Sequence, residues 1–256
     1  MAMVGSVIVR IYGDLRFFVR GSDCDGQLDV PSGAPRSIKD LVEAAGVPHP
    51  EVGLLLRNGE PVGFSAQVRP GDRVAVYPPF TTISVTDAPL LRPARPVPAR
   101  FVCDVHLHTL ARRLRLLGFD TWYRAATDDA ELARVAAAED RILLSRDRGL
   151  LMRASVTHGY CPRSDEPDTQ ALEVVSRFRL RDEFKPFARC VNCNGGLQPV
   201  AKEDVEAQLA PRTRAEQSQF ARCAGCGQVY WPGSHVDRMA AFVNAASAAG
   251  RQERKM

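Results

Sequence analysis

Four cysteines in the last third of the chain have a spacing that suits a metal site. They form two CxxC pairs, Cys190 with Cys193 and Cys223 with Cys226, which are separated by 29 residues, and a glycine follows each pair. Each pair can form a turn that presents two thiolates, so that four sulfurs close a tetrahedral Zn²⁺ site. Two disulfides or redox motifs are the alternative, which we disfavour because nothing indicates export and neither pair opens a helix after a strand. A four-thiolate site has no open coordination position, so the predicted zinc is structural and catalytic residues must lie elsewhere.

Aspartates at the ends of expected elements offer a different chemistry. Asp104 ends an apolar strand, Asp147 follows the strand Ile142–Ser145, and Asp129 stands in the first turn of the helix between them. Carboxylates that converge repel each other unless they share a cation, and oxygen ligands suit Mg²⁺ or Mn²⁺. A metal held in this way can activate water and neutralise charge on a phosphodiester, as in nucleases. Asp165 is a candidate fourth member.

Each aspartate also has a structural interpretation. Asp129 can serve the free amides of its helix, and Asp147 can form a turn in Arg146–Gly149. Asp104 is harder to explain in this way, because a carboxylate that ends a buried strand is costly unless it is paired or binds metal.

Arginines and aromatic residues add candidate contacts to nucleic acid. Arg112, Arg146 and Arg148 lie near the aspartates in sequence and can hold phosphates, although pairing with neighbouring acids is the equal alternative. Tyr230 and Trp231 can stack on bases, or cover the small core of a zinc lobe.

The elements that position these residues fall into two patterns separated by a proline-rich linker. Before the linker we expect a strand at Val7–Tyr12, a second strand after Gly13-Asp14, a helix capped by Ser37, a hairpin around Asn58-Gly59 and a strand at Arg73–Tyr77. This order resembles the ubiquitin-like β-grasp fold of sulfur-carrier proteins. Such carriers end in Gly-Gly, whereas this segment continues through Tyr77-Pro-Pro-Phe80, so we expect a docking module that binds a protein partner.

After the linker, strands and helices alternate. We expect strands at Phe101–Val105, Phe119–Tyr123, Arg141–Ser145 and Ser155–Cys161, and helices at Leu107–Leu117, at Asp128–Glu139 with Thr127 as cap, and at Asp168–Phe178. This βαβα order predicts a parallel sheet with ligands at the carboxyl ends of its strands.

Composition sets the remaining limits. The 256 residues are 45% hydrophobic and 25% charged with a net charge of +4, no apolar run approaches a membrane span, and no signal peptide is recognisable. With four cysteines on zinc, Cys24, Cys103 and Cys161 remain as free thiols, which favours a cytoplasmic protein.

The residues after the linker carry a family resemblance. The stretches Phe101–Asp104, Leu110–Asp120, Asp128–Leu132 and Arg141–Asp147, continued by Arg163-Ser-Asp165, the CxxC pairs and Val229–Trp231, resemble the PIN-like ribonuclease family named after the C-terminal domain of the mutator-seven exonuclease. Bacterial members often carry a ubiquitin-like domain in front, which matches residues 5–80.

This resemblance implies an α/β protein with five parts. They are a ubiquitin-like β-grasp domain (5–80), a linker (81–99), a PIN-like nuclease domain with a parallel sheet (100–185), a zinc ribbon (186–238) and a C-terminal helix or tail (239–256). It also implies Mg²⁺- or Mn²⁺-dependent cleavage of RNA.

The resemblance carries over to individual aspartates as well. Asp104, Asp129 and Asp147 match the family's acidic positions, and Asp128 is the reserve for Asp129. The family commonly has a further acid on an early helix, where Leu107–Leu117 offers only arginines. A non-catalytic RNA- or ribosome-associated module is therefore the alternative, whereas a PIN-class toxin is disfavoured because such toxins are short single domains.

Overall fold

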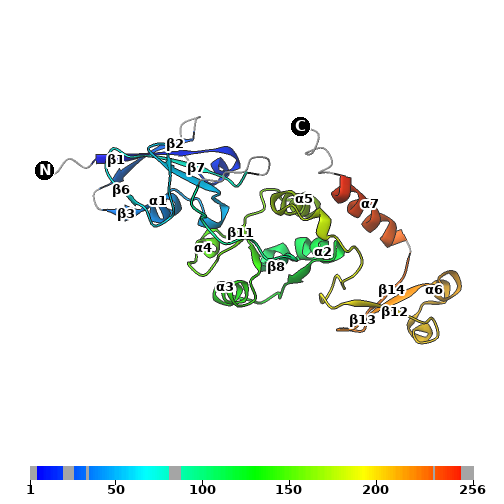
Figure 1. The fold of residues 1–256 in the computed structure, drawn as a ribbon. Helices are drawn as coiled ribbons and strands as arrows, with labels where there is room; N and C mark the ends of the chain where they lie inside the picture. The colour runs from blue at the N-terminus through cyan, green and yellow to red at the C-terminus, as the bar shows by residue number, and fades with distance from the viewer. Residues whose placement is uncertain (1–4, 20–25, 33–34, 81–87, 233, 249–256) are drawn as a thin grey trace. The chain divides into compact units, whose positions relative to one another are not determined.

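The computed structural model describes residues 5–19, 26–32, 35–80, 88–232 and 234–248, and Figure 1 shows its helices and strands. The chain divides into two compact units, residues 1–95 with 129–161 and residues 96–128 with 162–256. Residues 100–185, predicted as one domain, contribute to both units.

The first unit begins with a five-stranded sheet in the order β2-β1-β7-β4-β5. Its strands are β1 (Gly5–Ile11), β2 (Gln27–Ser32), β4 (Leu54–Arg57), β5 (Glu60–Pro61) and β7 (Arg73–Tyr77). β1 pairs with β7 in parallel, and the other pairs are antiparallel. A small antiparallel pair, β3 (Arg36–Ser37) with β6 (Gln67–Val68), adjoins helix α1 (Ile38–Ala44). The mixed sheet with its helix is the predicted β-grasp arrangement.

Local sequence explains the start of the helix and the hairpin turn. The Ser37 hydroxyl accepts a hydrogen bond from the backbone N–H of Asp40 at 3.1 Å, as expected for an N-cap. Asn58 and Gly59 have φ angles of 53° and 93°, which is the backbone conformation of a tight two-residue hairpin. Both predictions are confirmed.

The second strand predicted to follow Gly13-Asp14 is present, but a 3₁₀ helix comes before it. The segment Gly13–Phe18 forms a 3₁₀ helix, η1, and the second strand begins only at Gln27. Leu15 and Phe18 are both buried in η1. Their spacing of three residues matches the period of a 3₁₀ helix, so both side chains reach the core from one face.

Residues 129–161 complete the first unit. They form α3 (Asp129–Ala138), β10 (Ile142–Leu144), α4 (Arg148–Leu151) and β11 (Gly159–Tyr160). β10 and β11 pair in parallel, with Leu143 opposite Gly159. The strand predicted at 155–161 is therefore shorter, and α4 was not predicted. Within this unit β11 contacts η2 (His49–Glu51) of the ubiquitin-like part.

The second unit contains another parallel pair, β8 (Arg100–Cys103) with β9 (Asp120–Trp122). η3 (Val105–Leu107) and α2 (His108–Leu116) connect them, and α2 packs against α5 (Pro167–Phe178), which η4 (Arg181–Glu183) follows. The predicted apolar stripe of α2 is buried: it consists of Leu107, Leu110, Leu114 and Leu117. Parallel pairing in both units confirms the predicted α/β class.

Two details of this unit depend on single residues. Gly118 ends α2 with a φ of 97°, and a Cβ there would lie 2.2 Å from the carbonyl oxygen of Lys185, so only glycine fits. The Thr127 hydroxyl donates to the carbonyl oxygen of Arg124 at 3.2 Å. α3 begins at Asp129, one residue later than predicted.

The C-terminal part of this unit is a small antiparallel sheet in the order β12-β13-β14. Its elements are β12 (Leu197–Val200), η5 (Glu206–Gln208), α6 (Pro211–Glu216), β13 (Phe220–Cys223), β14 (Val229–Tyr230) and α7 (Ser234–Ala248). Its core consists of Val205, Leu209, Phe220 and Val229, with Val200 packed against it. Four residues make a small core, so this lobe needs a further source of stability.

The described part of the predicted linker, residues 88–99, forms no helix or strand. Among the residues placed in the structure, no helix has the length and apolar character needed to cross a bilayer. Cys103 and Cys161 are buried thiols, and Cys24 lies outside the described residues.

Candidate metal centre and acidic site

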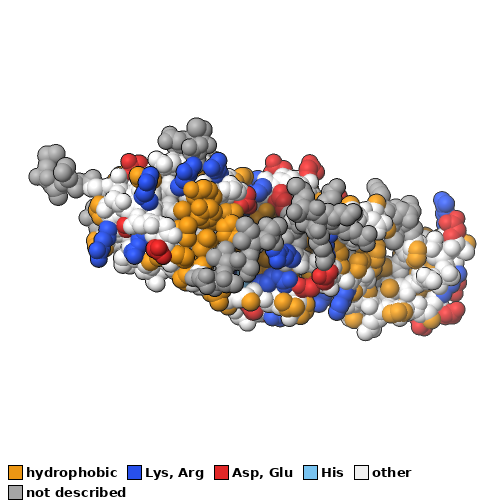
Figure 2. All heavy atoms as spheres, turned by 45° about the horizontal axis from the view of Figure 1, so that its top comes forward, with side chains coloured by type: hydrophobic (Ala, Val, Ile, Leu, Met, Phe, Trp, Pro, Cys, Tyr) orange, Lys and Arg blue, Asp and Glu red, His pale blue; other side chains and the backbone are white. Residues whose placement is uncertain are grey.

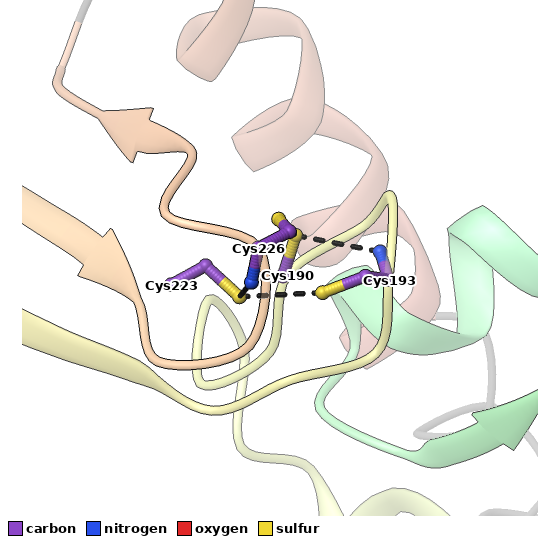
Figure 3. A group of neighbouring side chains, drawn as sticks. All are labelled: Cys190, Cys193, Cys223 and Cys226. Atoms are coloured by element: carbon purple, nitrogen blue, oxygen red, sulfur yellow. Dashed lines mark hydrogen bonds between the residues drawn. The ribbon is translucent and has the colours of Figure 1, made fainter.

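The two CxxC pairs converge into one cluster, which we call the cysteine cluster: Cys190, Cys193, Cys223 and Cys226 (Figure 3). Their four sulfurs all lie within 4.8 Å of one another. The Cys190 and Cys226 sulfurs are 3.7 Å apart, and those of Cys193 and Cys223 are 3.3 Å apart. These distances are far longer than the roughly 2.05 Å of a disulfide. They are close to the ~3.8 Å separation expected of thiolates placed tetrahedrally at about 2.3 Å around zinc.

Both pairs form the same kind of turn. In the first, the N–H groups of Cys193 and Gly195 point at the sulfurs of Cys190 and Cys193, at 3.5 and 3.4 Å. In the second, the N–H groups of Gly225 and Cys226 lie 3.3 and 3.5 Å from the sulfur of Cys223. Backbone donors aimed at sulfur stabilise thiolates, which are the form that binds metal.

The thiols of the cluster differ in acidity. Burial raises the pKa of Cys190, but the Tyr230 hydroxyl at 3.0 Å and neighbouring backbone N–H groups outweigh it and lower this pKa to about 7. Burial raises the pKa of Cys193 to about 12. Four adjacent thiolates repel one another, so a cation is needed before all four ionise. The cluster could therefore hold a metal ion such as zinc.

A buried arginine connects the first turn to the rest of its unit. Arg115 of α2 is only 2% exposed. Its guanidinium donates to the carbonyl oxygens of Val191 and Asn192 at 3.1 and 2.7 Å, and to that of Thr121 at 3.0 Å. Burial lowers its pKa, and the nearby thiol groups oppose that effect. Arg115 thus fixes the loop between the first two cysteines to β9.

The side chain of Asn194 makes a second connection. Its amide oxygen accepts from the N–H of Thr121 at 3.0 Å, and its amide nitrogen donates to Asp120 at 2.7 Å. Asn194 has a φ of 73°, which asparagine tolerates better than most residues. Arg115 and Asn194 were missed as supports of the cluster, because their partners lie far away in the sequence.

Asp104 lies at the carboxyl end of β8, as predicted. Its residue is buried, with 6% exposed, and its backbone carbonyl accepts from the N–H of Leu107 as η3 begins. Asp104 is the only buried residue among the five candidate aspartates, which makes it the strongest acidic candidate.

Asp129 and Asp147 both lie at helix starts in the first unit. Asp147 caps α4: its Oδ1 accepts from the N–H groups of Gly149 and Leu150 at 2.7 and 3.2 Å. Asp129 is the first residue of α3, and its Oδ2 lies 4.0 Å from the guanidinium of Arg153. Asp147 thus has the structural role considered from sequence, and Asp129 lies in the first turn of its helix. Asp147 is nevertheless exposed and Asp129 is half-buried, so solvent reaches both carboxylates.

Asp128 and Asp165 belong to the second unit, and both are exposed. The loop that carries Asp165 is well fixed, because the carboxylate of Glu173 accepts from the N–H groups of Arg163 and Ser164 at 2.7 and 2.9 Å. The position of Asp165 is thus set by α5.

The arginines and aromatic residues that are candidates for binding substrate differ in their surroundings. Arg112 is half-buried on α2, and Arg146 is exposed next to Asp147. Arg148 donates to the carbonyl oxygen of Phe18 at 2.6 Å, so part of its guanidinium serves a structural contact. Trp231 is 37% exposed, whereas Tyr230 is tied to the cysteine cluster.

Taken together, the fold and the cluster define an α/β protein with an N-terminal ubiquitin-like domain and a four-cysteine metal-binding site. Comparison with known families is more specific. The Mut7-C RNAse domain family matches residues 99–243, and the Mut7-C ubiquitin family matches residues 4–84. The chain therefore belongs to the Mut7-C RNase family, with its ubiquitin-like domain in front.

A curated relative agrees with this assignment. The human exonuclease mut-7 homolog is 27% identical to this chain over an alignment of 219 residues. The match covers 55% of this chain and 25% of the relative. The chain thus matches about a quarter of that relative's length. No solved structure matches significantly.

Proposed function

We propose that the protein is a metal-dependent ribonuclease that hydrolyses RNA phosphodiester bonds. Membership of an RNase domain family and similarity to an exonuclease homologue support a nuclease. The observation that carries the proposal is Asp104, a buried carboxylate at the carboxyl end of a parallel strand, where α/β proteins bind their ligands.

On the family resemblance, we propose that Asp104, Asp129 and Asp147 are the ligands of the divalent ion, Mg²⁺ or Mn²⁺, with Asp128 and Asp165 as further oxygen donors. Carboxylate oxygen is the ligand that these hard cations prefer. When bound, such an ion supplies an activated water and neutralises charge on the phosphodiester. Asp147 can use its capping Oδ1 for α4 and offer its other oxygen to the site. The resulting domain is PIN-like.

We propose further that the cysteine cluster binds Zn²⁺ and forms a zinc ribbon. Its closed set of four sulfurs leaves no position for substrate, so the zinc stabilises the small C-terminal lobe. Reduced cysteines require a reducing compartment such as the cytoplasm. Arg112, Arg146 and Arg148 contribute positive charge toward RNA phosphates. Figure 2 shows basic and acidic side chains interspersed on the face that it draws.

The test is cleavage of a labelled single-stranded RNA by the zinc-loaded protein, with and without Mn²⁺. Asp104→Asn should abolish Mn²⁺-dependent cleavage, because the amide cannot replace the charge that holds the ion. Asp29→Asn is the matched control, since Asp29 is an exposed aspartate on β2 of the ubiquitin-like domain. Equal loss in both variants would contradict the role of Asp104.

One observation favours a second function, a non-catalytic RNA- or ribosome-associated module. α2 (His108–Leu116) contains no acidic residue, although nucleases of this kind commonly carry one on an early helix. RNA binding without metal-dependent cleavage, from the parent protein and across several RNAs, would establish this alternative.

A further inference from the structure

The ubiquitin-like domain shares a pocket with the loop that carries Asp147. The pocket has a volume of about 530 Å³ and is lined by Phe17, Arg146, Arg148 and Cys161. Phe17 belongs to η1 of the ubiquitin-like domain, and the other three belong to residues 129–161 of the same compact unit. This volume falls within the usual range of small-molecule sites, roughly 300–1,000 Å³.

Specific contacts hold the two sides of this pocket together. Arg148 donates from Nη1 to the carbonyl oxygen of Phe18 at 2.6 Å, and its guanidinium lies 5.3 Å from the centre of the Phe18 ring. Glu51, which is 1% exposed, accepts from the N–H of Cys161 at 2.7 Å. His49 Nε2 lies 2.9 Å from the carbonyl oxygen of Val156. The bond between Glu51 and Cys161 is both buried and charge-assisted, and bonds of that kind are costly to break, so the pocket is a fixed feature of the unit.

The pocket combines two chemistries that suit a nucleotide. Phe17 is a large apolar side chain that is 44% exposed, while its neighbour Phe18 is buried and meets it edge to face at 5.4 Å. Arg146 is exposed and adjacent in sequence to Asp147. An aromatic ring accepts a base by stacking, and an arginine binds a phosphate.

We propose that this pocket binds one nucleotide of a single-stranded RNA, with its base against Phe17 and its phosphate at Arg146. The inference rests on the proposed function and assigns the ubiquitin-like domain a direct part in substrate binding. Arg148 then has a double role, because its bond to Phe18 positions η1 while its side chain lines the pocket.

Binding of a fluorescein-labelled oligoribonucleotide, measured by anisotropy on the full zinc-loaded chain without added Mg²⁺ or Mn²⁺, tests this proposal. Loss of one base stack should raise the Kd of Phe17→Ala by about 5- to 150-fold. Phe17→Trp should bind the RNA at least as tightly as the parent protein, because indole stacks at least as well as phenyl. Arg146→Gln should weaken binding and reduce the salt slope by about one.

Leu90→Ala provides the control, because Leu90 is an exposed apolar residue of the same unit outside the pocket. If Phe17→Ala binds RNA as tightly as Leu90→Ala, the pocket does not bind RNA. Cleavage by the parent protein with Mn²⁺ is measured separately. Intact cleavage with unaffected binding in Phe17→Ala would overturn this inference alone, whereas absent cleavage with weakened binding would overturn only the nuclease.

Discussion

Gly195 offers a sharp test of the metal site, because a single methyl group should disturb it. A Cβ at this position would lie 2.8 Å from the sulfur of Cys223 and 3.4 Å from that of Cys193. Ordinary contact begins near 3.4 Å, so the Cys223 sulfur or the turn must move by about 3.4 − 2.8 = 0.6 Å. Metal–ligand distances tolerate only about ±0.2 Å. Gly195→Ala should therefore weaken the zinc site.

The size of the effect follows from the cost of overpacking. Inserting one methyl group into a well-packed site costs about 1–3 kcal/mol. If this cost falls on the metal-bound state, the zinc Kd rises by roughly 5- to 150-fold. Competition with a chromophoric chelator measures this change directly, and thermal unfolding with and without zinc reports its effect on the lobe.

The adjacent glycine provides the control. A Cβ at Gly196 would meet no atom within 4 Å, so Gly196→Ala makes the same chemical change in open space. Gly196→Ala should retain the parent affinity. Equal zinc affinities for Gly195→Ala and Gly196→Ala would show that the sulfurs are not held as the structure has them, and would refute the reasoning.

Two further predictions concern buried polar side chains. Arg115→Met leaves three carbonyl oxygens without their donor, two of them in buried hydrogen bonds, and should cost about 2–5 kcal/mol in urea unfolding, whereas half-buried Arg112→Met should cost less than about 1 kcal/mol. Equal losses would contradict the role of Arg115. Burial, and then the charge of Arg92, lowers the pKa of His158 below its ordinary value of 6.5. The unfolded state therefore binds this proton more tightly, and the free energy of unfolding should fall as the pH drops below about 6.5, by at most ~1.4 kcal/mol per pH unit. Unfolding of His158→Gln at several pH values checks this, and an unchanged pH dependence would contradict it.

Features that depend on local spacing could be predicted from the residues alone. The two CxxC pairs, with a glycine shortly after each pair, predicted turns whose sulfurs converge. The structure brings the four sulfurs within 4.8 Å of one another. Asn58-Gly59 predicted a hairpin, Ser37 predicted a helix cap, and the leucines of α2 predicted its buried face. Except for the meeting of the two cysteine pairs, the interacting groups lie within one turn or one helix, so nearby residues contain the information.

The partner of each long polar side chain, by contrast, depends on the folded chain. Arginines near the aspartates looked alike in sequence, yet Arg115 is buried under the cysteine cluster, Arg148 binds the backbone of η1, and Arg146 stays exposed. A guanidinium at the end of a flexible chain can reach many acceptors, and only packing between distant segments selects one. The same reason applies to Phe17, whose exposure beside Arg146 depends on how the ubiquitin-like domain packs within its unit.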